Sequence, residues 1–124
     1  MSTYKEEFLI AKHSKELFVN LYDLLANVPK RDYFIKDEIN NSMLLLIKYV
    51  YEINFLAAER LEVVAKLKTQ ISLLDFYLGI LYNKKYISEK QYEKQISKLT
   101  EITKMVTVWI RNKELRDVKW NSDF

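Results

Sequence analysis

The sequence predicts an all-α protein, an up-down-up-down four-helix bundle, and three observations lead to this fold class. Apolar residues make up 49% of the 124 residues and recur at helical spacing in four long stretches. The chain holds one Gly and one Pro, too few for the many tight turns that a sheet protein needs. Short connections join the four stretches, as expected for antiparallel helices that are neighbours in the bundle.

The first helix is expected at about residues 3–27. Thr3 and Glu6 fit a capping box, in which each side chain satisfies a free backbone N–H of the other residue. Pro29 cannot continue a helix interior, so the helix is expected to end near Asn27. One buried stripe is formed by Ile10, Leu17, Leu21, Leu24, Leu25 and Val28.

The second helix is expected at about residues 32–58, with Asp32 as its N-cap. Its main apolar stripe consists of Ile35, Ile39, Met43, Leu46, Val50, Ile53 and Ala57. Leu44, Ile47, Tyr51 and Phe55 widen this stripe beyond what one partner helix covers. We therefore expect this helix to contact more than one neighbour, another subunit being one candidate.

The third and fourth helices are expected at about residues 61–83 and 88–112. The third buries Val64, Leu67, Ile71, Leu74, Leu78 and Leu81. The fourth has the clearest start, since Ser88 and Gln91 form a capping box and Ile87 and Tyr92 a hydrophobic staple. Its stripe comprises Ile96, Leu99, Ile102, Val106, Trp109 and Ile110. Residues 1–112 thus form the bundle, and residues 113–124 form a polar C-terminal tail.

The composition excludes several classes of function. The absence of Cys removes disulfides, thiol nucleophiles and Cys-based zinc sites, and one Gly cannot build a Gly-rich phosphate loop. The single His, His13, cannot supply the paired Glu-x-x-His motifs of a di-metal bundle. We therefore expect no catalytic residue, no metal, no cofactor and no enzymatic activity. Without an apolar run of ~18 residues or a signal-peptide layout, we expect no membrane span and a cytoplasmic location.

The charge is distributed unevenly along the chain. The net charge is +3, but residues 1–62 sum to −2 and residues 63–124 to +5. Cations gathered on one surface neutralise phosphates, so the basic half suggests RNA or DNA as a partner. Because Glu89, Glu93 and Glu101 interleave with the cations, an ordinary solvated helix face is the alternative. The candidate nucleic-acid or partner-binding residues are Lys30, Arg31, Lys84, Lys85, Lys90, Lys94, Lys98, Arg111 and Lys113. Within this set, the spacing of Lys90, Lys94 and Lys98 predicts one ridge on the fourth helix.

Two segments resemble a known family over about residues 10–112. Residues Leu21–Ile39, LYDLLANVPKRDYFIKDEI, resemble the end of the first helix and the following loop of Avd, the accessory variability determinant of diversity-generating retroelements. Residues Ile87–Ile110 resemble the fourth helix of that family, which reads IS-x-KQYE and closes on Trp-Ile. The matching positions are Ile87, Ser88, Lys90, Gln91, Tyr92, Glu93, Glu101, Ile102, Lys104, Met105, Trp109 and Ile110.

The resemblance implies a non-enzymatic four-helix bundle that assembles as a homopentameric ring. Such a protein binds the reverse transcriptase and the template RNA of the retroelement and supports error-prone cDNA synthesis. The related 23S rRNA-intervening-sequence proteins share the bundle. The alternative is a stand-alone structural or protein-interaction bundle without a nucleic-acid function.

Three departures from the family pattern bear on this choice. Two positions of the third helix that often carry Arg in the family are Asp75 and Gly79 here, which weakens the basic surface that the resemblance implies. Asp75 is expected either on the outer face of the helix or at a subunit contact. A Gly-Gly pair before the Trp of the fourth helix is Thr107–Val108 here, so we expect the packing there to differ.

Overall fold

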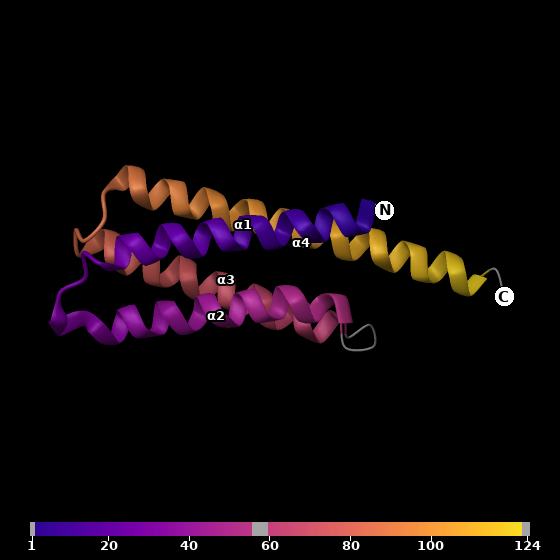
Figure 1. The fold of residues 1–124 in the computed structure, drawn as a ribbon, viewed down its shortest axis with the longest axis horizontal. Coiled ribbons are helices and arrows are strands. Elements are labelled where there is room, and N and C mark those ends of the chain that lie inside the picture. The colour runs from indigo at the N-terminus through magenta and orange to yellow at the C-terminus, as the bar shows by residue number, and fades with distance from the viewer. Residues whose placement is uncertain (1, 56–59, 123–124) are drawn as a thin grey trace.

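The computed structural model confirms the all-α four-helix bundle (Figure 1). It describes residues 2–55 and 60–122, and the side chains of residues 9–53 and 61–112. The helices are α1 (Ser2–Leu25), α2 (Tyr33–Phe55), α3 (Arg60–Asn83) and α4 (Glu89–Ser122), with a short 3₁₀ helix, η1 (Lys30–Asp32), before α2. Where the structure describes the chain, all regular secondary structure is helical.

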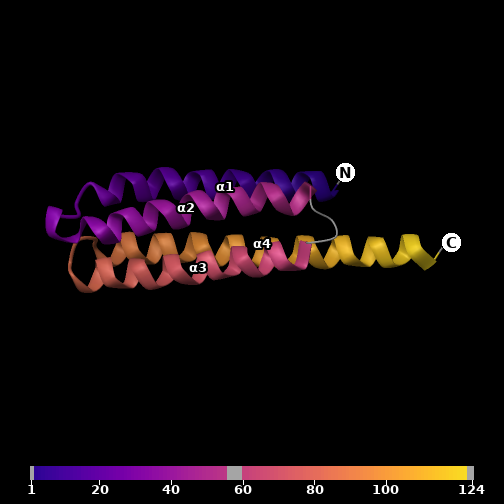
Figure 2. The same cartoon turned by 90° about the horizontal axis from the view of Figure 1, so that it is seen from below.

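The four helices pack as a square in which each helix contacts the two beside it. α1 packs against α2 and α4, and α3 packs against α2 and α4. Figure 2 shows α1 and α2 as one layer and α3 and α4 as the other. The α1–α2 and α3–α4 connections lie at the same end of the bundle (Figure 1), which we call the loop end.

The predicted apolar stripes form the core. Every predicted stripe residue of α1 and α3 is buried, and so are all those of α2 up to Ile53. In α4, Leu99, Ile102, Val106, Trp109 and Ile110 are buried, while Ile96 is half-buried at the edge. Helical spacing alone thus identified the core, because a residue every three or four positions faces the same side of a helix. Ala57 lies outside the described residues.

The first connection differs in detail from the prediction. α1 ends at Leu25, and the next residues tighten into turns through bonds such as Asn27 N–H to the Leu24 carbonyl (3.1 Å). α1 begins at Ser2, so Thr3 lies inside the helix, and the side chains of its predicted capping box lie outside the described part. Asp32 is not simply the N-cap of α2: it ends η1, is buried, and turns its carboxylate toward the α3–α4 connection.

The second connection was predicted more closely. α3 ends at Asn83, as expected, and α4 follows Ser88. The Ser88–Gln91 capping box is confirmed: Gln91 N–H donates to Ser88 Oγ (3.1 Å), and Ser88 N–H donates to Gln91 Oε1 (2.8 Å). The helical backbone of α4 continues past the predicted end at 112 to Ser122, because residues 113–122 contain no Pro or Gly to stop it.

Candidate nucleic-acid interface

Four of the nine candidate cations meet at the loop end. Lys30 and Arg31 belong to η1, and Lys84 and Lys85 follow the last turn of α3. More than fifty residues separate the two pairs along the chain, yet both connections lie at one end of the bundle (Figure 1), and all four residues are exposed. The fold therefore gathers positive charge that the sequence holds in two separate segments.

A buried carboxylate fastens the two connections to each other. Tyr86 Oη donates a hydrogen bond to Asp32 Oδ2 (2.5 Å), and Lys84 Nζ lies 3.3 Å from the same oxygen. Arg31 donates to the Tyr86 hydroxyl (3.4 Å) and lies 4.0 Å from Asp32 Oδ2. The Tyr86 hydrogen bond, helped by Lys84 and Arg31, holds the pKa of Asp32 below its ordinary value of 3.8. We call these four residues the Asp32 clasp.

Lys85 has an unusual backbone. Its φ is +64°, the left-handed region, and among the described residues other than glycine it alone has a positive φ. Lys85 N–H donates to the Tyr82 carbonyl and Tyr86 N–H donates to the Leu81 carbonyl, which is the Schellman pattern that ends a helix. Glycine is the usual residue at this position, because a Cβ there costs about 1 kcal/mol. A lysine thus occupies a place where glycine would be more stable.

The predicted ridge on α4 is broken. Lys90 and Lys94 are exposed, but Lys98 turns toward α1, where its Nζ donates to Glu16 Oε2 (3.0 Å) and lies 3.1 Å from His13 Nδ1. Four residues advance a helix by slightly more than one turn, so an i, i+4, i+8 row drifts around the axis. By position 98 this drift has reached the seam between α1 and α4.

The remaining two candidates do not join the loop end. Arg111 is exposed on α4, but it lies twenty-one residues beyond Lys90, which is about 31 Å along a helix. Lys113 belongs to the α4 backbone, and its side chain lies outside the described residues. The nine candidates therefore do not form one continuous patch.

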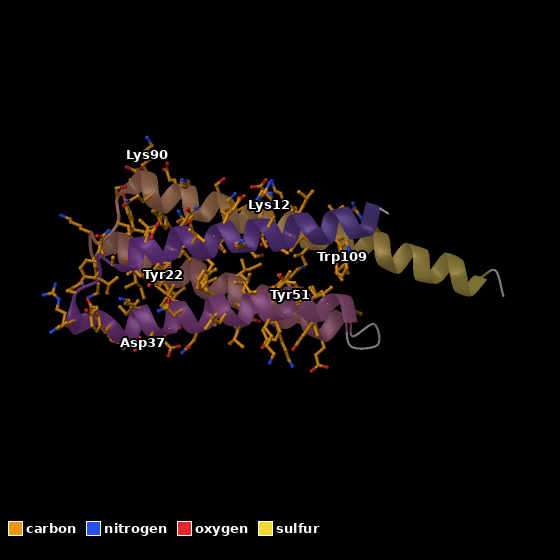
Figure 3. All side chains as sticks on the ribbon, viewed as in Figure 1. Lys12, Tyr22, Asp37, Tyr51, Lys90 and Trp109 are labelled. Atoms are coloured by element: carbon orange, nitrogen blue, oxygen red, sulfur yellow. The ribbon has the colours of Figure 1, made fainter. Side chains whose placement is uncertain are left out.

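Two further lysines lie beside the α4 cations. Lys12 and Lys15 of α1 border a shallow groove between α1 and α4, opposite Lys94 (Figure 3 labels Lys12). Sequence reasoning missed them, because one helix does not reveal which face its neighbour covers. The available signal was their i, i+3 spacing, which places both on one side of α1. The groove is lined by Lys12, Lys15, Glu16, Val19, Asn20, Lys94 and Lys98.

In the described part of the chain, no group of three or more His, Asp or Glu side chains is arranged to hold a metal ion. His13 contacts Glu16, Glu101 and Lys98 and is half-buried at the α1–α4 seam. No helix over the same residues is long and apolar enough to cross a membrane.

Comparisons with known proteins identify relatives of this bundle. The family model described as bAvd-like matches residues 8–113. A crystal structure at 1.70 Å of a protein of unknown function from the S23 ribosomal protein family of Bacteroides thetaiotaomicron has a similar fold. The two chains are 18% identical with a TM-score of 0.75, and the match covers 86% of this chain and 98% of the other. No curated protein matches the chain.

The left-handed backbone at Lys85 generates a first prediction. We expect Lys85→Gly to raise the free energy of unfolding by about 1 kcal/mol, because it removes the Cβ from a left-handed position. Urea denaturation at one protein concentration measures this. As the matched control, Lys94→Gly in the interior of α4 should lower stability by about 1 kcal/mol. Equal losses in both variants would contradict the backbone assignment.

The Asp32 clasp generates a prediction on pH. The folded-state pKa of Asp32 is lowered, so its contribution to stability is present above the unfolded value of about 3.8 and is lost as pH falls through the folded value. Tyr86→Phe removes the main cause of this shift. We expect the variant to be less stable than the parent protein at pH 7, with the difference shrinking below pH 4. Urea denaturation across this range tests it, and Tyr51→Phe, which removes an exposed hydroxyl, should show no such trend.

Proposed function

The chain belongs to the bAvd-like family, and on this basis we propose that it is a non-enzymatic accessory protein of the Avd kind. In this proposal, copies of the chain form a ring, a pentamer by family resemblance, that acts in the cytoplasm. The ring binds nucleic acid and a reverse transcriptase and supports template-RNA-dependent cDNA synthesis in a diversity-generating retroelement. The observation that carries the proposal is the family match over residues 8–113, which spans nearly the whole bundle.

The charge of the loop end supports the nucleic-acid part of this proposal. Lys30, Arg31 and Lys85 are exposed cations at one end of the bundle, and Asp32, which links the two connections through Tyr86 and Lys84, is buried. Because residues in sparsely populated backbone regions collect at functional sites, the left-handed Lys85 is a further supporting observation. At this position the chain carries a cation that glycine would not provide.

Exposed apolar side chains support the assembly part. On α3, Leu73 and Phe76 are exposed one turn apart, and the Tyr77 ring meets Phe76 edge-on, with centroids 5.7 Å apart. On α2, Leu44 and Tyr51 are exposed two turns apart, so they share a face. A cyclic ring needs two different surfaces on each copy, one for each neighbour. The two apolar faces meet that requirement.

A second candidate function is a protein-interaction bundle without nucleic-acid binding, and the departures from the family pattern favour it. Asp75 is exposed on α3, where relatives often carry Arg, so it places a negative charge on that surface. A Cβ at Gly79 would meet nothing within 4 Å, so its small size is not required by packing inside the chain. Thr107 and Val108, which stand where the family has Gly-Gly, are also exposed.

Binding to structured RNA tests the proposal directly. We expect the chain to bind at low salt and to weaken steeply as salt rises, since phosphate contacts release counterions. Lys30→Gln together with Lys85→Gln should lower the salt slope by about 1.4–1.8, the value for two phosphate contacts. Filter binding at several salt concentrations measures both effects.

The matched control removes two charges elsewhere. Lys48 and Lys66 form ion pairs with carboxylates on their own helices, Glu52 and Glu62. Lys48→Gln together with Lys66→Gln should leave the salt slope unchanged. No RNA binding by the parent protein at low salt would contradict the nucleic-acid function and favour the interaction bundle.

Assembly is tested by light scattering. A pentamer of the 14.9 kDa chain has a mass of about 75 kDa. Phe76→Lys introduces a charge on α3 at a side chain that is 62% exposed in the single chain, so the helix should still fold. At an interface this charge would be buried without a partner, and we expect the mass to fall.

The control for assembly is Val108→Lys, an exposed position on α4 that belongs to neither apolar face. It should keep the mass of the parent protein. A parent protein that elutes as a single chain would refute the ring. If Phe76→Lys keeps the mass of the parent protein, as Val108→Lys should, the exposed face of α3 is not part of the interface.

A further inference from the structure

We infer that the groove between α1 and α4 is a second nucleic-acid contact, which holds the phosphate backbone of a single strand. We infer also that Glu16 limits how tightly the strand is held. This inference rests on the proposed function, because it names the ligand and the residues of one part of the binding surface. It concerns a different place from the loop end, and the experiments below separate the two.

One polar contact joins the two walls of the groove. Lys98 Nζ donates to Glu16 Oε2 at 3.0 Å and lies 3.1 Å from His13 Nδ1. Lys12 and Lys15 lie on the α1 wall, and Lys94 lies one turn before Lys98 on the α4 wall. The groove is open, with a volume of about 540 Å³.

The charge in the groove is strongly positive and mostly unpaired. Of the lining residues, Lys98 and Glu16 neutralise each other. Lys12, Lys15 and Lys94 form no ion pair with any side chain that the structure describes. Three free ammonium groups therefore face one concavity, and a concave surface lined by one sign of charge concentrates ligands of the opposite sign.

The lining chemistry selects the class of ligand. Ammonium groups bind phosphates as point charges, whereas none of the described residues that line the groove has an aromatic ring to stack on a base. Contact should therefore be to the backbone and independent of sequence. A single strand is flexible enough to lay successive phosphates into this short, open groove, whereas a duplex, with a persistence length of about 50 nm, would lie across it as a stiff rod.

Glu16 opposes this binding. It is the acidic residue among those lining the groove, and Lys98 holds its pKa below the ordinary value of 4.5 through a hydrogen bond. It therefore stays ionised at neutral pH, repels a phosphate and occupies the ammonium of Lys98. Replacing it with a neutral amide would free Lys98 and add one positive charge to the groove.

The test uses fluorescence anisotropy with a labelled 20-nucleotide oligouridine, which forms no duplex, at 0.1 M salt. Each phosphate contact to a single strand contributes a salt slope of about 0.7, or about fivefold in affinity at 0.1 M salt. We expect Lys12→Gln together with Lys15→Gln to weaken binding about 20-fold. Glu16→Gln should tighten binding about threefold. The substitution removes the repulsion between the Glu16 carboxylate and a phosphate that lies several ångströms away through solvent.

The controls separate this inference from the proposed function. The Lys48→Gln, Lys66→Gln variant should bind as the parent protein does, and circular dichroism checks that each variant folds. If the parent protein binds structured RNA but not this strand, the inference is overturned and the nucleic-acid function stands. If it binds neither at low salt, both are overturned. If Lys30→Gln together with Lys85→Gln weakens binding but Lys12→Gln together with Lys15→Gln does not, the inference about the groove is overturned and the nucleic-acid function stands. Unchanged or weaker binding by Glu16→Gln overturns the role of Glu16.

Discussion

The arrangement of the loop end depends on the interactions of one buried carboxylate, that of Asp32. Apolar stripes hold the four helices together, but they do not specify how the two connections meet. A carboxylate removed from water must be paired and hydrogen-bonded, and Asp32 finds its partners, Tyr86 and Lys84, in the other connection. The clasp thus couples η1 to the α3–α4 turn and places Lys30 and Lys85 on one end of the molecule.

The α1–α4 seam shows the same use of charge at a helix interface. Glu16 and His13 lie on α1, and Lys98 and Glu101 of α4 face them. These groups are partly exposed, so each pair contributes little to stability by itself. The buried apolar residues of α1 and α4 set how the two helices face each other, and the ion pair occupies Lys98. Lys12, Lys15 and Lys94 form no ion pair with the described side chains across the groove.

The sequence was sufficient for the features that repeat locally and insufficient for those that depend on which helices meet. Helix phase predicted the buried stripes, and the Ser88–Gln91 box predicted the start of α4, because both signals lie within a few residues. Asp32 was predicted as a cap, since a capping Asp and a buried, paired Asp look alike in a single sequence. Lys98 was placed on an exposed ridge because the drift of its row toward α1 matters only once α1 is known to be there.

Each chain carries exposed apolar faces on its sides and cations at its loop end, and this separation affects how strongly a ring of copies would bind phosphates. Single cations on a surface bind phosphates weakly, and the loop end of one chain offers only a few of them. In the proposed ring, apolar faces such as that of Leu73 and Phe76 join the copies, and cyclic symmetry turns every loop end in the same direction. Contacts after the first are then made at a high effective concentration, so avidity rises with each copy. Such a ring would let a chain with a net charge of only +3 hold a polyanion through repetition.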